Sequence, residues 1–311
     1  IFHLTVRSVS RVTGRSAVAA AAYRAGERLT NARDGLTHDY SGKPVLEAFI
    51  LAPTLAPPWA SDRSSLWNAA ELAEKRKDAK VAREYELALP AELNQGERRS
   101  LAVQFAQVLI ARYGVAVDVA LHPPDALGDQ RNFHAHLLTT TRAMGPEGLG
   151  EKTRQLDVSS TASVEVEALR ASWAQLVNDQ LERADLSERV DHRSFQRQGK
   201  TIEPTVKMGP VITAIERRAQ SADVSGDQTQ PVTSRGRLNA LILEMRRLVD
   251  YVDLGREFIA QNTAKLATAA RLTASKAKQL TAVMSLFRTL PAMEAAVEKD
   301  QAKDRERDRG L

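Results

Sequence analysis

Alternating apolar and polar residues predict β-strands in the amino-terminal half of the chain. In residues 115–122 the odd positions are valine or leucine, whereas the even positions are alanine, Asp118 and His122. Residues 2–7 and 83–89 divide in the same way, and so does the segment that begins at His134. Side chains two residues apart share a face of a strand, so each segment has an apolar face and a face with ionisable groups. The pattern predicts an α+β fold, in which an antiparallel sheet has helices on one face and a polar surface on the other.

Helical patterns occur between and after these strands. The predicted helices are residues 17–24, 61–80, 94–113 and 163–184, with further helices from residue 235 onward. Ser16 is the expected N-cap of the first helix. Residues 34–58 contain several prolines and are expected to be extended. The predicted organisation is an α+β domain at residues 1–215, a linker at 216–234 and a helical extension at 235–311.

The composition excludes several classes of protein. The 311 residues are 43% hydrophobic, which is enough for a core, and 27% charged. No apolar run is as long as a membrane span and no signal peptide is evident, so we expect no stable membrane insertion. The absence of cysteine argues against a thiolate metal cluster and fits a reducing cytoplasm. The chain starts at Ile1 instead of methionine, so we expect that its start is trimmed or that its numbering is offset.

Positive charge is concentrated near the amino terminus, although the net charge of the whole chain is only +5. Before Asp34, the only acidic residue is Glu27. The basic residues of the same stretch are Arg7, Arg11, Arg15, Arg24, Arg28 and Arg33. Arginines clustered beside a polar site are expected for phosphate recognition, because guanidinium groups bind phosphate oxygens in pairs. Basic residues also serve solubility alone, so the cluster indicates nucleic acid without establishing it.

Three of the six histidines fall in one candidate hairpin. His134 and His136 are two residues apart on a strand and therefore face the same way. If the strands pair across the turn-rich segment 123–133, His122 lies opposite His134, with Cβ atoms about 5 Å apart. Three neutral ligands would leave coordination positions open for a substrate, as in catalytic metal sites. The alternative is a polar face that only meets water, and the residues do not choose among Mg²⁺, Mn²⁺ and Zn²⁺.

Tyr23 is the candidate nucleophile, because phosphodiester cleavage at a metal site also needs an attacking group. A tyrosine hydroxyl with an ordinary pKa of about 10 needs a nearby positive charge or a base. The candidates are Arg15, Arg24 or the metal for the charge, and Glu84, Glu86 or Asp118 for the base. A tyrosine in an alanine-rich helix is also a common core residue, so the local sequence does not decide between the two roles.

Several motifs, taken in order, resemble one family. They are Ile1–Thr5, Gly14–Glu27, Leu87–Pro90, Asn132–Arg142, Asp191-His192-Arg193 and Met208-Gly209-Pro210. Over residues 1–210 the chain is similar to the MobA/MobL family of plasmid mobilisation relaxases. These are HUH endonucleases, a class named for histidine–hydrophobic–histidine, here His134-Ala135-His136. The resemblance implies the two-layer relaxase fold and a metal-dependent, strand-specific nick at a plasmid transfer origin. The active-site tyrosine would attack the scissile phosphate and stay joined to the 5′ end, so that the strand can later be rejoined.

The resemblance also implies roles for particular residues. The matching positions are Tyr23 for the nucleophile, His122, His134 and His136 for the metal ligands, and Glu84 and Glu86 for the acidic strand near them. The candidate DNA contacts are Arg7, Arg11, Arg15, Arg24, Arg142 and Arg193. We expect Mg²⁺ or Mn²⁺ as cofactor. The expected partners are transfer-origin DNA (a single strand plus a hairpin or duplex), accessory mobilisation proteins and the conjugative coupling protein, in the bacterial cytoplasm.

Other functions remain open at this point. They are an HUH replication initiator, a non-catalytic DNA-binding protein of the same fold, and a metal-dependent hydrolase that uses activated water. In initiators the tyrosine usually follows the histidine motif, whereas Tyr23 precedes it, which favours a relaxase. Whether Glu84 or Glu86 is a general base or orients a histidine is also open.

Overall fold

The chain forms two compact units, Ile1–His192 (unit 1) and Arg193–Leu311 (unit 2). A computed structural model describes residues 2–126, 129–222, 230–261, 266–287 and 299. The division between the two units, after His192, lies earlier in the sequence than the domain boundary that we expected after residue 215. Parts of the expected linker and helical extension lie outside the described residues, namely 223–229, 262–265, 288–298 and 300–311.

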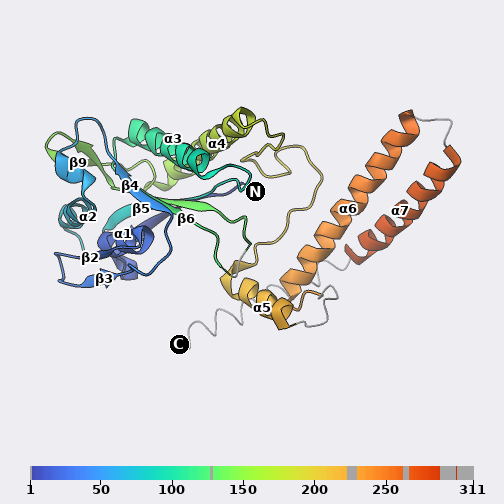
Figure 1. Ribbon diagram of the computed structural model, residues 1–311, viewed down its shortest axis with the longest axis horizontal. Helices are drawn as coiled ribbons and strands as arrows, with labels where there is room; N and C mark the ends of the chain where they lie inside the picture. Colours follow the sequence, from blue (N-terminus) through green and yellow to red (C-terminus); the bar gives the residue numbers. More distant parts are fainter. Residues whose placement is uncertain (1, 127–128, 223–229, 262–265, 288–298, 300–311) are drawn as a thin grey trace. The chain divides into compact units, whose positions relative to one another are not determined.

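Five antiparallel strands form the main sheet of unit 1, in the order β1-β5-β7-β6-β4 (Figure 1). Their bounds are Leu4–Ser10 for β1, Lys80–Ala88 for β5, His134–Thr139 for β7, Val117–His122 for β6 and Glu47–Leu51 for β4. The four strands expected from the alternation are present, and β4 comes from the stretch expected to be extended. The α+β prediction is confirmed.

Helices α3 (Gln95–Tyr113) and α4 (Ser159–Arg183) cover the apolar face of this sheet (Figure 1). In α3, an Asn94–Glu97 capping box begins the helix, and Phe105 packs edge-on against Trp173 of α4, with ring centroids 5.3 Å apart. Both aromatic side chains are fully buried. Burying such a side chain stabilises the fold by about 1.5–3 kcal/mol, so this core holds the strands that carry the ionisable residues.

The opposite face of the sheet also carries helices. Helices α1 (Ala17–Ala25) and α2 (Arg63–Leu72) lie over part of it (Figure 1). The alternation predicted helices on one face of the sheet only, so this second layer is a correction. Small side chains explain the second layer. Ala82 of β5 and Ala116, just before β6, are completely buried there and form part of the apolar surface against which α1 and α2 pack. The rest of this face holds the histidines.

Helix α2 is shorter than the helix expected over residues 61–80. Beyond its last residue, Leu72, the chain is bound by Arg11. The Nη1 atom of Arg11 donates hydrogen bonds to the carbonyl oxygens of Glu74 and Arg76, at 2.8 and 3.0 Å. In a continuing helix these oxygens would accept from N–H groups four residues later. The chain therefore leaves the helix here and enters β5.

Short hairpins and a helical region complete the described residues. The hairpins are β2 (Arg28–Thr30) with β3 (Thr37–Asp39), and β8 (Arg142–Gly145) with β9 (Gly148–Lys152). Unit 2 contains α5 (Gly209–Ala222), α6 (Ser234–Gln261) and α7 (Leu266–Phe287), of which α6 and α7 pack together. The helices expected after residue 235 are thus present where the chain is described. No described helix has the length and apolar character to cross a membrane.

Candidate metal centre and nucleophile

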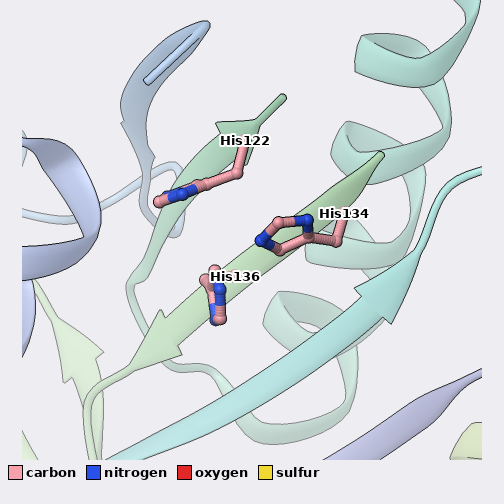
Figure 2. Close-up of side chains that lie close together, drawn as sticks. All are labelled: His122, His134 and His136. Carbon is pink, nitrogen blue, oxygen red and sulfur yellow. The ribbon is translucent and has the colours of Figure 1, made fainter. Parts of the chain in front are cut away.

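The hairpin of β6 and β7 brings the three predicted ligands together. His122 is the register partner of His134, and Ala120 is the partner of His136. Figure 2 shows the three side chains lying close together. One ring nitrogen of each residue lies within 4.8 Å of those of the other two. The predicted cluster is therefore present, and its geometry follows from a two-residue strand period and an antiparallel register.

One nitrogen of each ring has a hydrogen-bond partner outside the cluster. His122 donates from Nε2 to the carbonyl oxygen of Arg24 at 2.8 Å, and His134 donates from Nδ1 to that of Asn132 at 3.0 Å. His136 donates from Nδ1 to Oε1 of Glu84 at 2.8 Å. A carbonyl oxygen can only accept, so these bonds set the tautomers. His122 thus presents Nδ1 as its lone-pair nitrogen, and the other two rings present Nε2, as metal-binding histidines do.

The surroundings of the cluster keep His122 and His134 neutral. Burial lowers the pKa of His122 to about 3, helped by the positive charge of Lys43. Burial also lowers the pKa of His134. Burial alone would raise the pKa of Glu84, but hydrogen bonds from His136 and Arg24 outweigh it and bring the value to about 2. Near pH 7 the site therefore contains uncharged imidazoles at His122 and His134 and a charged carboxylate at Glu84. Three imidazole nitrogens with a carboxylate behind one of them are a donor set that fits a divalent metal ion.

Tyr23 lies on the last turn of α1. Ser16 caps this helix by accepting from the backbone N–H of Ala19, and the buried carboxylate of Glu71 accepts from that of Ala17 at 2.6 Å. The alanines of α1 pack against the sheet, whereas the Tyr23 side chain is 46% exposed. The core role considered for this tyrosine is therefore wrong, and its ring is open to a substrate.

Arg24 connects α1, the helix of Tyr23, to the histidines. Its guanidinium group makes two contacts with Glu84, from Nε to Oε1 and from Nη2 to Oε2, both at 2.6 Å. The same Glu84 oxygen Oε1 accepts from His136, and the Arg24 carbonyl accepts from His122. The residue beside Tyr23 is thus bound to the histidine cluster through both its side chain and its backbone.

Comparison with known proteins shows the family of the chain. The model of the MobA/MobL family matches residues 15–218 of the chain. The chain belongs to the MobA/MobL family.

Its relatives in this family include mobilisation and transfer proteins. It is 39% identical over 245 residues to "Mobilization protein MobL" of Acidithiobacillus ferridurans, an alignment that covers 70% of this chain and 64% of that protein. It is 33% identical over 255 residues to "Conjugal transfer protein TraA" of Rhizobium radiobacter, covering 72% of this chain and 22% of the relative. The chain therefore matches only a part of each of these longer relatives.

A solved structure supports the family fold. It comes from a study described as "Molecular Basis of Vancomycin Resistance Transfer in Staphylococcus aureus". It is 30% identical to this MobA/MobL chain and superposes with a TM-score of 0.56. The superposition covers 62% of this chain and 99% of the other.

The two candidate glutamates of this MobA/MobL chain have different surroundings. Glu84 is buried and binds His136 and Arg24. Glu86 lies one step further along the same face of β5, pairs with Arg7 at 3.5 Å and has a side chain that is 28% exposed. Asp118, the third candidate base, is buried and accepts from Arg63 and from Trp67 Nε1 at 2.8 Å. Of the three, Glu84 hydrogen-bonds a histidine of the cluster, and Glu86 is the register partner of His136 on the neighbouring strand.

The arginines predicted to contact DNA fall into two groups. Arg11 and Arg142 are bound inside unit 1, to Glu71 and Glu74 respectively, and Arg24 is bound to Glu84. The side chain of Arg7 is 53% exposed, and Arg15 and Arg193 are exposed as well. Contact with DNA stays a prediction, and the exposed arginines are the ones placed to make it.

Lys43 is a neighbour of Tyr23 that the sequence patterns did not identify. Its Nζ atom lies 3.5 Å from the centroid of the Tyr23 ring and donates to the Tyr23 carbonyl oxygen at 3.1 Å. The residue belongs to the extended stretch 34–58, where no periodicity indicates a face. The glycine of the Ser41-Gly42-Lys43 turn was the signal available, and a turn signal does not say what the turn contacts.

Proposed function

We propose that this chain nicks and rejoins one strand of plasmid DNA at a transfer origin, through a covalent bond to Tyr23. One observation carries the proposal. The exposed Tyr23 is followed by Arg24, which is bound to both His122 and the His136 partner Glu84. A potential nucleophile and an imidazole cluster are therefore held together through Arg24, and phosphoryl transfer requires such fixed positions.

His122, His134 and His136 would hold a divalent cation, for which Mg²⁺ and Mn²⁺ are our candidates. The imidazole donors favour Mn²⁺, because Mg²⁺ prefers oxygen ligands. When bound, the ion would neutralise charge on the non-bridging oxygens of the scissile phosphate. Glu84 fixes the ring of His136, and its low pKa makes it a weak base, so we assign it orientation and not proton abstraction.

In the nick, Tyr23 Oη forms a bond to phosphorus while the bond from phosphorus to the 3′ oxygen breaks. The downstream strand stays joined to Tyr23 through its 5′ phosphate, and the 3′ oxygen of the upstream strand takes a proton from solvent and becomes a 3′ hydroxyl. The phenol is half exposed, so its proton can pass to solvent. One phosphodiester replaces another, and attack by the 3′ hydroxyl therefore reverses the step and rejoins the strand.

The proposed substrate is transfer-origin DNA, bound as a single strand at Tyr23 and as a hairpin or duplex elsewhere. Arg7, Arg15 and Arg193 would contact phosphates, so binding should weaken steeply as salt is raised. We also propose accessory mobilisation proteins and a coupling protein as partners, and the bacterial cytoplasm as the place of action. These proposals rest on the family resemblance and on the names of longer relatives, which are mobilisation and conjugal transfer proteins.

A covalent-trapping experiment tests the proposal. The protein and a Tyr23→Phe variant are incubated with Mn²⁺ or Mg²⁺ and with single-stranded oligonucleotides that tile the DNA flanking the gene. We expect a metal-dependent protein–DNA band on a denaturing gel that the variant lacks. Cleavage without this band would instead indicate a water-using nuclease, and binding without cleavage would indicate a non-catalytic DNA-binding protein.

A further inference from the structure

The turn Tyr40-Ser41-Gly42-Lys43 lies directly against the end of α1. Lys43 N–H donates to the Tyr40 carbonyl at 2.9 Å, and Asp39 accepts from both the backbone N–H and the hydroxyl of Ser41. Gly26, which ends α1 with φ +66°, permits the approach. A Cβ atom there would lie 2.9 Å from Cγ2 of Val45 and 3.0 Å from the Lys43 carbonyl oxygen.

This turn contacts the Tyr23 ring on two sides. The Lys43 ammonium group lies over the face of the ring, 3.5 Å from its centroid. The ring of Tyr40 meets it edge-on, with centroids 5.2 Å apart and planes at 90°. Lys43 also holds the Tyr23 carbonyl oxygen, which is one of the acceptors left unpaired at a helix C-terminus. The ring is thereby oriented while nearly half of the side chain stays exposed.

The position of Lys43 is electrostatically unfavourable for an ammonium group. Burial, and after it the neighbouring Arg24, lower the pKa of Lys43 to about 8, and Glu84 acts in the opposite direction. The group still carries its charge near pH 7. A lysine that served packing alone would fill this place with its methylene stem and extend its charge to water. Here the charge is directed at the ring of the proposed nucleophile.

We propose that Lys43 is a positioning residue of the nicking reaction, which orients Tyr23 and stabilises the negative charge that its phenol ring gains as it attacks and when it leaves. The proposal rests on the proposed function. Lys43 exchanges no proton in either direction. A cation over an aromatic face is attracted more strongly as the ring becomes anionic, so the contact favours the reacting state over the resting one.

The test compares the rate of covalent adduct formation at saturating DNA and Mn²⁺ among matched variants. Lys43→Met removes the charge but keeps the chain length, and Lys43→Gln keeps an N–H donor for the Tyr23 carbonyl without the charge. Lys43→Arg restores the charge. Lys75→Met removes an exposed charge from α2's outgoing loop and serves as the control. Affinity for uncleaved DNA is measured with each variant, using Tyr23→Phe as the background.

We expect Lys43→Met and Lys43→Gln to form adduct roughly 10-fold more slowly, with DNA affinity and melting temperature near those of the unaltered protein. Lys43→Arg should recover most of the rate, and Lys75→Met should lose none. Rates within twofold of the unaltered protein for Lys43→Gln would overturn the proposal, as would an arginine variant as slow as the glutamine one. If the unaltered protein forms no adduct, the proposed function fails first and this proposal fails with it.

Discussion

His122 donates a hydrogen bond from Nε2 to the carbonyl oxygen of Arg24, over 2.8 Å. A ligand of the proposed metal is therefore bonded to the backbone of the residue that follows the proposed nucleophile. Any ion that fixes the His122 ring also fixes the last turn of α1, because the ring cannot rotate without breaking this bond. Metal binding and the placement of Tyr23 are thus expected to be one event.

Metal affinity should depend on Glu84 and not on Glu86. Glu84→Gln removes the charge that holds the His136 ring, and the loss of such a partner typically weakens metal binding about 10- to 100-fold. The matched control is Glu86→Gln, on the same face of the same strand, where the carboxylate pairs with exposed Arg7. Calorimetric titration with Mn²⁺ distinguishes them. Equal losses in the two variants would contradict the assignment of Glu84.

Metal removal should destabilise the protein by mass action. With Mn²⁺ at about 100 times its dissociation constant, the folded state gains about 2.7 kcal/mol, and EDTA should reverse the gain. His136→Ala removes a ligand, so its melting temperature should not respond to Mn²⁺ or to EDTA. Differential scanning calorimetry makes the comparison. A full response in the alanine variant would place the metal elsewhere.

Gly26→Ala should destabilise unit 1. The added Cβ would sit 2.9 Å from Val45 and would force a left-handed backbone on a residue with a side chain. Together these should cost about 2 kcal/mol or more in urea unfolding. In contrast, Gly42→Ala puts its Cβ in open space, and we expect a change within about 0.5 kcal/mol. Similar effects at the two glycines would argue against the close approach of the turn to α1.

The pH dependence of stability should reveal the cost of the Lys43 charge. Its pKa is lowered from 10.5 to about 8 by burial and by Arg24, against Glu84, with the neutral rings of His122 and His134 also near. The folded state therefore disfavours the ammonium group fully below pH 8, and this cost disappears as the pH rises to 10.5.

Lys43→Met should consequently melt no lower than the unaltered protein at pH 7, and any advantage should shrink by pH 10.5. Thermal melts of the two proteins at both pH values give the difference directly, because shared titrations cancel. A variant that melts clearly lower at pH 7 would show that Lys43 stabilises the fold.

The histidine cluster could be predicted because its cause is local. A two-residue period and one turn-rich segment suffice to bring His122 opposite His134, and the structure has this register. The order of strands was not predictable in this way. β5 lies between β1 and β7 through pairings distant in sequence, such as Arg7 with Glu84, and no local pattern encodes them.

Sequence patterns also could not predict which groups the long charged side chains bind. Arg11 and Arg24 lie in the same basic stretch as Arg15 and were grouped with it as DNA contacts. Arg11 turns toward Glu71 and Arg24 toward Glu84, each 60 residues away in the chain. A guanidinium group binds a carboxylate and a phosphate equally well, so composition cannot tell an internal partner from an external one.

The parity of β7 has a consequence for folding errors. Ala135 and Leu137 point into the core beneath α3, whereas His134 and His136 point to the other face. A pairing shifted by one residue would turn both histidines into that core and expose the leucine, and it would also take the chelating nitrogens away from His122. A misregistered hairpin would thus lose its hydrophobic burial and its metal together, so a chain that binds the ion has also paired its strands correctly.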